Sequence, residues 1–147
     1  MNLDFASVWE MISDIVPEND ALICGDEIIS WKDYDLQSSK IATALKNAGL
    51  GPNSKAGLYL NNSNEYLIGQ NAIFKIGGVP INVNYRYVAE ELIYLLDNSD
   101  SEAVFYHACY SSRIKEISGS LPNIKAWIEI ADGTKSEFED SLKFEEL

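Results

Sequence analysis

Apolar positions along the chain recur at two different spacings, which predict alternating helices and strands. Spacings of three and four residues predict helices over residues 5–16, 32–48, 64–76, 89–96 and 109–117. Short apolar runs predict strands over residues 21–24, 28–31, 55–60, 79–83, 102–106 and 124–130. Because the later strands alternate with helices, we expect an α/β fold: a layered, mostly parallel sheet with helices on both faces.

Residues with strong turn and capping preferences support these boundaries. Gly25–Glu27 separates the first two strands and indicates a hairpin. Ser30 with Asp33, and Asn62 with Glu65, are spaced as helix caps. Gly77–Gly78 follows the third helix, where we expect both glycines to adopt the left-handed conformation that ends a helix.

The charge balance excludes two classes of partner. The chain has 23 acidic and 11 basic residues, a formal net charge of −12, and no cluster of lysine and arginine. Nucleic acids and anionic membranes are bound by such clusters, so we expect neither as a partner. The apolar runs are also too short to span a bilayer, so no membrane span is expected.

Cysteine and histidine offer no catalytic or metal-binding pattern. Cys24 and Cys109 are isolated thiols, so we expect a reducing, cytoplasmic environment and interpret both as small buried hydrophobic residues. His107 is the single histidine, and we expect a surface or structurally hydrogen-bonded role for it. We therefore assign no catalytic residue and no metal ligand.

The last twelve residues differ in composition from the rest of the chain. Residues 136–147 hold five acidic residues against one lysine, Lys143, with three apolar residues spaced among them: Phe138, Leu142 and Phe144. We interpret this acidic tail as a short docking helix or as a solvated face. With no linker elsewhere, residues 1–147 are predicted to form a single domain.

The stretch 72–96 carries a resemblance to a known family. It resembles the amino-terminal region of the adenylate-forming acyl-CoA synthetases, the AMP-dependent synthetase/ligase family. That family shows a K-x-G-x-V-P-like turn, an N-x-R-Y/L loop and an E-E-L helix. The corresponding residues here are Lys75, Gly77, Val79, Pro80, Asn84, Arg86, Tyr87, Glu90, Glu91 and Leu92.

The resemblance implies a reaction but not a complete active site. Family enzymes convert a carboxylic acid, ATP and CoA to acyl-CoA, AMP and pyrophosphate, so ATP, Mg²⁺ and CoA are implied for the full-length enzyme. The family's glycine-rich phosphate loop, similar to T-S-G-T-T-G-x-P-K, is absent from the chain. We therefore expect an N-terminal part of an AMP-binding domain that binds no cofactor alone and is inactive alone.

The resemblance makes three basic residues candidates for contacts with a CoA phosphate, because the family's residues after the strand 79–83 border the passage of the CoA nucleotide. Arg86 matches the family motif, and it follows a strand whose carboxyl end lies on the side where open α/β sheets bind ligands. Arg113 and Lys115 are candidates by approximate alignment with the family. Alternatively, an arginine here bonds backbone carbonyls and fixes the loop.

Partners and alternative functions also follow from the resemblance. A chain that ends at residue 147 is expected to leave apolar surface and a strand edge uncovered, most of all at the helix 64–76 and the loop Tyr85–Tyr87. We expect a homo-oligomer, or association with the remainder of a separately encoded synthetase. The alternatives are a stand-alone, non-catalytic binding or assembly module and, with less support, a small nucleotide-binding protein.

Overall fold

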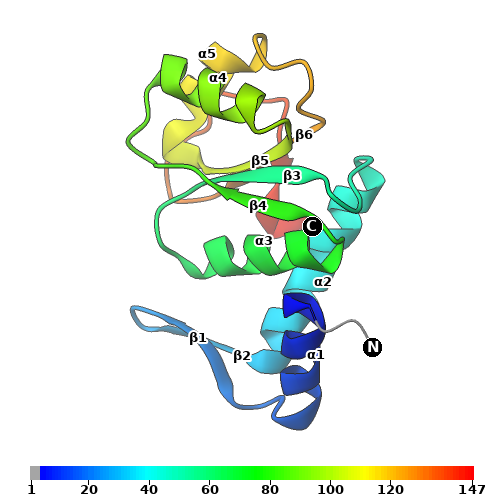
Figure 1. Cartoon of the computed structure of the whole chain (residues 1–147). Coiled ribbons are helices and arrows are strands. Elements are labelled where there is room, and N and C mark those ends of the chain that lie inside the picture. Colours follow the sequence, from blue (N-terminus) through cyan, green and yellow to red (C-terminus); the bar gives the residue numbers. More distant parts are fainter. Residues whose placement is uncertain (1–3) are drawn as a thin grey trace.

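The computed structural model describes residues 4–147, and Figure 1 shows their arrangement. The helices are α1 (Phe5–Ile15), α2 (Trp31–Asn47), α3 (Asn64–Lys75), α4 (Ala89–Asn98) and α5 (Ser111–Ser118), with 3-10 turns η1 (Ala108–Tyr110) and η2 (Phe144–Glu146). The strands are β1 (Asp20–Cys24), β2 (Glu27–Ser30), β3 (Lys55–Tyr59), β4 (Val79–Asn82), β5 (Ser101–His107), β6 (Ala126–Ile130) and β7 (Leu142–Lys143).

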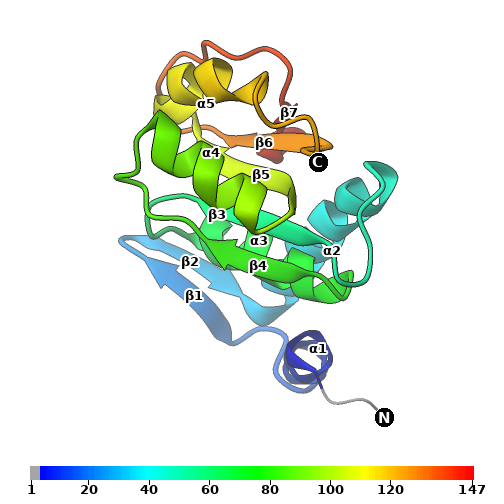
Figure 2. The same ribbon diagram turned by 45° about the horizontal axis from the view of Figure 1, so that its top comes forward.

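A five-stranded parallel sheet forms the centre of the molecule. Its strand order is β4-β3-β5-β6-β7, and every neighbouring pair is parallel. Parallel strands require crossover connections, and here the helices α3 and α4 supply them within the β3–β4–β5 part. The chain crosses from β5 to β6 through α5 in the same way (Figure 2).

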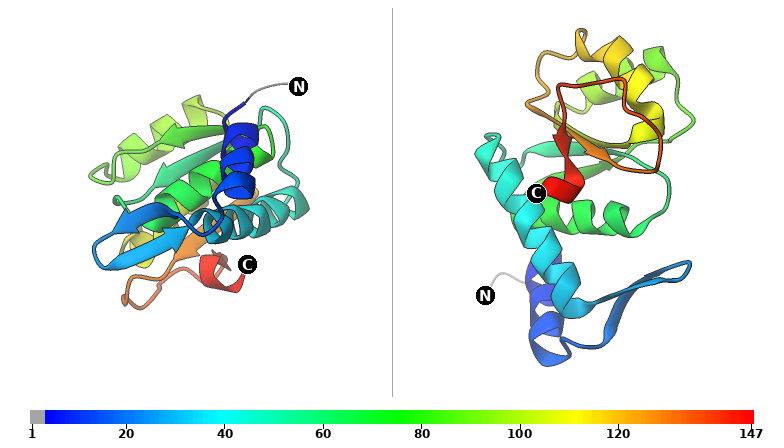
Figure 3. Two further views of the ribbon diagram at one scale, coloured as in Figure 1. Left: turned by 90° about the horizontal axis from the view of Figure 1, so that it is seen from below. Right: turned by 180° about the vertical axis from the view of Figure 1, so that it is seen from behind.

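Helices cover both faces of this sheet, as Figures 1 and 3 show. On one face, alternate residues of β5 such as Phe105 pack with residues of α2 and α3. On the opposite face, Val104 and Tyr106 pack with residues of α4 and α5. The predicted α/β class, a mostly parallel sheet with helices on both faces, is confirmed.

An antiparallel hairpin and α1 extend from the side that holds α2 and α3 (Figure 1). The strands β1 and β2 pair around the predicted turn, and Ile29 pairs with Leu22 inside the core. The predicted cap of α2 is also present, because the Asp33 amide donates to Ser30 Oγ at 3.1 Å. For α3, however, the capping residue is Ser63 and not Asn62, since the Tyr66 amide donates to Ser63 Oγ.

Lys75 ties three helices together at the end of α3. Its Nζ lies 2.5 Å from Glu10 Oε1 of α1 and 2.7 Å from Asp35 Oδ1 of α2, and its side chain is only 8% exposed. Burial alone would lower the pKa of Lys75, but hydrogen bonds to Asp35 and Glu10 outweigh burial and raise that pKa. The charged form is therefore the one that stabilises this junction.

Gly77 and Gly78 are required for different reasons. Gly77 has a φ of +71°, the left-handed conformation that ends α3 as predicted. Gly78 does not have a positive φ, so that part of the prediction is wrong. A Cβ at Gly78 would lie 2.8 Å from Ser54 O, so glycine is needed there for close backbone packing.

The acidic tail contributes to the sheet. Its residues Leu142 and Lys143 form β7, which pairs with Ile128 and Glu129 of β6, and η2 follows directly. The expected docking helix is therefore a two-residue strand and a 3-10 turn. Phe138 and Phe144 are nevertheless buried, at 7% and 8% exposure, so the segment docks through aromatic side chains.

Exposure differs from expectation at several apolar residues. Cys24 and Cys109 are exposed, so the prediction that both are buried is wrong. The helix predicted over residues 64–76 is covered by α2 and α1, and Leu67, at 39%, is the exposed one among its large apolar residues. The loop Tyr85–Tyr87 exposes an aromatic side chain as expected, with Tyr85 at 40%, and further exposed apolar side chains lie on α1, where Phe5 is 65% and Ile15 72% exposed. Across residues 4–147, no helix is long and apolar enough to cross a bilayer.

Candidate functional site

The carboxyl ends of the parallel strands carry a group of tyrosine, asparagine and arginine side chains. Tyr59 ends β3, and Asn61 follows it in the loop to α3. The loop 83–88 leaves β4, and α5 follows the end of β5. Ligands of open α/β sheets bind at this end, so the sheet places these side chains where a ligand site is expected.

Arg113 fixes the loop that follows β4. Its Nη1 donates to Tyr59 Oη at 2.6 Å and to the carbonyl oxygen of Tyr87 at 2.8 Å. The Tyr59 hydroxyl also donates to this carbonyl, at 3.2 Å. The Arg113 side chain is half-buried, so the geometry supports the alternative in which an arginine bonds backbone and fixes the loop.

Arg86 is presented to solvent by that same loop. Its amide donates to Asn84 Oδ1 at 3.0 Å, a local turn that shapes the loop. Its guanidinium lies 5.1 Å from the centre of the Tyr85 ring, within cation–π range. The residue is exposed, so its guanidinium donors are accessible from solvent.

Lys115 and the start of α4 complete this edge. Lys115 is exposed on α5, two positions after Arg113, a spacing that places the two side chains on different faces of the helix. Val88 is the capping residue of α4 and has no side-chain acceptor, yet its own amide donates to Glu91 Oε2 at 2.9 Å. The structure thus places Arg86 in the loop and Arg113 and Lys115 on the neighbouring α5, from which Arg113 is hydrogen-bonded to the loop.

Sequence reasoning missed the two tyrosines of this site. The Tyr59 and Tyr110 rings lie 4.7 Å apart, and the Tyr110 hydroxyl donates to Asn61 Oδ1 at 3.1 Å. Burial raises the pKa of Tyr59, although its hydrogen bond from Arg113 opposes this shift. An aromatic residue at the end of a buried strand is the signal that could have found Tyr59. Tyr110 follows no such pattern.

His107 is a structural residue of the strand end. It is 7% exposed, and its Nδ1 accepts a hydrogen bond from the Asn61 amide at 3.3 Å. Burial lowers its pKa, while the carboxylates of Asp132, Glu65 and Glu145 oppose that shift. The neutral ring is therefore favoured, in agreement with the structurally hydrogen-bonded role expected for it.

The electrostatic environment of Cys109 disfavours the thiolate form that a nucleophile requires. Its amide donates to Asp132 Oδ2 at 2.9 Å, which keeps that carboxylate beside the thiol. Burial and the Asp132 carboxylate raise the pKa of Cys109 to about 11, so the reactive thiolate is disfavoured. Within residues 4–147, no group of three or more His, Cys, Asp or Glu side chains is placed to hold a metal ion.

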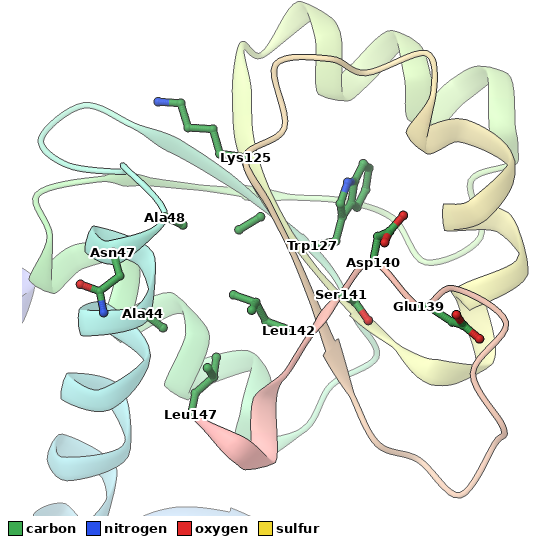
Figure 4. A pocket seen from close by; sticks show the side chains of 11 residues that line it. Ala44, Asn47, Ala48, Lys125, Trp127, Glu139, Asp140, Ser141, Leu142 and Leu147 are labelled. Carbon is green, nitrogen blue, oxygen red and sulfur yellow. The ribbon is translucent and has the colours of Figure 1, made fainter.

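A hollow lies elsewhere, beside the edge of the sheet formed by β6 and β7. This edge groove has a volume of about 580 Å³ and lies between the end of α2 and the strands β6 and β7 (Figure 4). Its lining includes Ala44, Ala48, Lys125, Trp127, Leu142 and Leu147. The groove contains none of the three candidate phosphate contacts, so it is a separate feature.

We expect removal of the Arg113 guanidinium to destabilise the loop after β4. In Arg113→Met, the Tyr59 hydroxyl and the Tyr87 carbonyl lose a charged donor, which costs about 2 kcal/mol of unfolding free energy. Lys115→Met is the matched control on the same helix, and its exposed position predicts a change within about 0.5 kcal/mol. Urea denaturation measures the unfolding free energy of both variants. If Arg113→Met were as stable as Lys115→Met, the hydrogen bonds of Arg113 would not stabilise the loop.

Comparison with known proteins establishes the family. A model of the family described as AMP-binding enzyme matches residues 13–147. The chain belongs to the AMP-binding enzyme family. Its resemblance to the amino-terminal region of the adenylate-forming acyl-CoA synthetases is thereby confirmed.

Relatives of this chain include acyl-CoA ligases. It is 37% identical over 136 residues to the medium/long-chain-fatty-acid–CoA/3-oxocholest-4-en-26-oate–CoA ligase of Mycobacterium marinum, covering 92% of this chain and 25% of that protein. It is 35% identical to the 3-oxocholest-4-en-26-oate–CoA ligase of Rhodococcus rhodochrous, covering 94% and 25%. The chain thus spans about a quarter of the length of these relatives.

Solved structures of this family share the fold. Acetoacetyl-CoA synthetase from Streptomyces lividans superimposes with a TM-score of 0.89 at 21% identity, covering 99% of this chain and 25% of that one. The N-terminal domain of FACL13 from Mycobacterium tuberculosis gives 0.80 at 20% identity, covering 86% and 34%. These similarities show that the architecture of the chain is that of the family's amino-terminal part.

Proposed function

We propose that this chain forms the amino-terminal layer of an ATP-dependent acyl-CoA synthetase. The parent reaction converts a carboxylic acid, ATP and CoA to acyl-CoA, AMP and pyrophosphate. The observation that carries the proposal is the 37% identity to an acyl-CoA ligase across 92% of the chain. The chain's part in this enzyme is to build one sheet with its covering helices and to present the loop 83–88.

We expect these 147 residues alone to be inactive. Transfer of an adenylyl group requires preorganised donors around the triphosphate of ATP, which a glycine-rich loop and a lysine usually supply. The sequence contains no such loop. The described residues also offer no carboxylate cluster that fits Mg²⁺. ATP and Mg²⁺ would be held by other parts of a complete synthetase.

Within that enzyme, Arg86 is proposed to contact a phosphate of CoA. Its exposed guanidinium follows the carboxyl end of β4, and a guanidinium can donate two parallel hydrogen bonds to phosphate oxygens. Lys115 is a second exposed cation on the neighbouring α5. Arg113 is assigned a supporting part, because its Nη1 is already engaged by Tyr59 and Tyr87.

The acid substrate is proposed to be apolar. The Mycobacterium marinum relative is a ligase of medium- or long-chain fatty acids and of 3-oxocholest-4-en-26-oate, and the Rhodococcus rhodochrous relative is a ligase of 3-oxocholest-4-en-26-oate. We assign none of the residues described here to acid selection. A cytoplasmic location and a homo-oligomeric state stay predictions.

Pyrophosphate release tests the claim that the chain is inactive alone. Purified chain is mixed with ATP, Mg²⁺, CoA and decanoate or palmitate, and pyrophosphate is measured with and without the acid. We expect no acid-dependent release of pyrophosphate, because these residues contain no glycine-rich loop to bind the triphosphate. Acid-dependent release at a rate above the acid-free control would contradict the proposal.

A further inference from the structure

The helix α1 turns an apolar stripe toward solvent. We define the α1 stripe by four side chains that are 40% to 72% exposed: Phe5, Val8, Met11 and Ile15. Spacings of three and four residues place them on one side of the helix, over about 15 Å. The residues that α1 buries, Ala6 and Ser13, are small and lie on the opposite side. The fold therefore leaves four large apolar residues of this helix in contact with solvent.

Contacts on the opposite side of α1 fix the orientation of this helix. Ser13 Oγ donates to the carbonyl oxygen of Trp31 at 3.2 Å. Glu10 Oε1 lies 2.5 Å from Lys75 Nζ, at the junction with α2 and α3. Figure 1 shows α1 beside α2, at the outside of the molecule. Because rotation of α1 about its axis would break both contacts, the exposure of the α1 stripe is built into the fold.

The part of the chain that carries the α1 stripe is strongly acidic. Residues 1–35 contain nine acidic residues and one lysine, a net charge of −8 out of the −12 of the whole chain. That lysine, Lys32, lies 3.9 Å from Glu18. Asp14 follows Met11 by three positions and therefore neighbours the stripe. It is exposed and forms no ion pair with any of residues 4–147, so its carboxylate is available to a cation from outside the chain.

An amphipathic helix with lysine or arginine beside its apolar residues matches this surface. Its apolar residues would cover the α1 stripe, and its cations would face Asp14 and the net charge of −8. A second copy of the chain would bring the same negative charge to this face, and an anionic membrane is repelled for the same reason. The charge therefore favours a basic polypeptide over both.

The α1 stripe lies mostly outside the stretch that identifies the family. The family model matches residues 13–147, so Phe5, Val8 and Met11 precede the matched stretch. The loop 83–88, which presents Arg86, lies within that stretch and joins β4 to α4. The stripe is therefore a surface of this chain in particular, and it is separate from the candidate functional site.

We propose that the α1 stripe docks a basic amphipathic helix of another protein, with the apolar residues of that helix on the stripe and a lysine or arginine beside Asp14. This inference goes beyond the proposed function, because it concerns a protein partner and not the reaction. A stripe of four residues is small for an interface, so the complex belongs to the weak, transient class.

A methyl NMR signal on the stripe tests the proposal. The chain has two methionines, Met1 and Met11, so labelling the methionine methyl groups with ¹³C gives two signals, which Met11→Leu assigns. The probe is a synthetic helix-forming peptide of about 18 residues, with leucines at helical spacing and lysines beside them. We expect the Met11 signal to shift and to saturate as the peptide is added. An unchanged Met11 signal, with or without binding elsewhere, would overturn the proposal.

Two further peptides separate charge from apolar contact. One keeps the leucines and replaces each lysine with glutamate, and the other keeps the lysines and replaces each leucine with serine. We expect both to bind about tenfold more weakly than the probe, because each lacks one half of the match. If the serine peptide bound as tightly as the probe, attraction to the net charge of −12 would explain the binding, and the proposal would fail. Equal binding of the glutamate peptide would refute the basic partner.

Variants of the chain give an independent measurement by calorimetry. Ile15→Gln removes an apolar side chain that is 72% exposed, so we expect an intact fold and about fivefold weaker binding of the probe. Asp14→Asn should also weaken binding, by a factor that shrinks as salt is added. Tyr94→Gln is the matched control, because Tyr94 is 71% exposed on α4, which covers the other face of the sheet. Equal affinities of Ile15→Gln and Tyr94→Gln would contradict the proposal.

Three other occupants of the stripe give different results. A second copy of the chain would shift the Met11 signal with protein concentration when no peptide is present. A lipid surface would broaden that signal when phosphatidylcholine vesicles are added. The rest of a synthetase would abolish peptide binding in a chimera in which this chain replaces the matched part of the Mycobacterium marinum ligase. Each of these results would overturn the proposal, and acyl-CoA formation by the same chimera tests the proposed function separately.

Discussion

Replacing Gly78 with alanine is expected to lower the free energy of unfolding by about 3 kcal/mol. A Cβ at this position would lie 2.8 Å from Ser54 O and 3.1 Å from Ile73 O. Both oxygens already accept backbone hydrogen bonds, from Val79 and from Gly78 itself. Neither can retreat without breaking the start of the β3–β4 pairing or the end of α3, so the strain falls on the backbone.

Gly119→Ala is the matched control for this substitution. Gly119 has a φ of −65°, and a Cβ there would meet no atom within 4 Å. We expect its stability to be unchanged or raised by about 0.5 kcal/mol, because alanine restricts the unfolded chain. Urea denaturation measures both variants, and a Gly78→Ala protein as stable as the control would contradict the close packing described here.

Replacing Glu129 with leucine is expected to cost about 3 kcal/mol of unfolding free energy. Glu129 is 4% exposed, and its carboxylate accepts from Tyr106 Oη at 3.0 Å, Ser136 Oγ at 2.5 Å and Lys143 Nζ at 2.7 Å. Leucine fills a similar volume but leaves three donors without their acceptor. Because Ser136 and Lys143 lie in the carboxyl-terminal segment, that segment is expected to loosen first.

The Glu129 carboxylate also makes the stability of the folded protein depend on pH. Burial would raise the pKa of Glu129, but hydrogen bonds from Lys143, Ser136 and Tyr106 outweigh burial and lower it. Its stabilising contribution is therefore present above the unfolded pKa of about 4.5 and is lost as pH falls through the lower folded value. The stability of Glu129→Leu should fall less steeply with acidity than that of the wild type.

Glu116→Leu provides the control for both effects, because Glu116 is exposed on α5. We expect its stability to change by about 0.5 kcal/mol or less at neutral pH. Its acid dependence should follow the wild type. If Glu129→Leu and Glu116→Leu were equally stable from pH 7 to pH 3, the Glu129 carboxylate would not stabilise the carboxyl-terminal segment.

Local patterns were sufficient to predict most of the fold. Apolar spacing and capping residues are properties of short segments, so the parallel sheet, its helices, the Ser30 cap and the turn at Gly77 could all be derived from sequence. The strand β7 could not, because two residues carry no periodicity and its pairing partner Ile128 lies fourteen positions earlier. The packing role of Gly78 could not be predicted either, because it depends on a tertiary contact with Ser54.

The candidate site was predictable only in its location. The family motif and the position after a strand were enough to select Arg86 and its loop. In the structure, Arg86 is exposed to solvent. Tyr59 and Arg113 come from β3 and α5, and only the folded chain shows that both hold the Tyr87 carbonyl. The exposure of Cys24 and Cys109 was also missed, because thiol burial depends on which side of an element faces the core.

A domain exchange tests most directly the claim that this chain is the amino-terminal layer of an acyl-CoA synthetase. The chain replaces the matched 136 residues of the Mycobacterium marinum ligase, and acyl-CoA formation from decanoate, ATP and CoA is measured. We expect the chimera to form acyl-CoA, with an Arg86→Ala chimera showing a raised KM for CoA. A folded chimera that releases no pyrophosphate and forms no thioester would contradict the account.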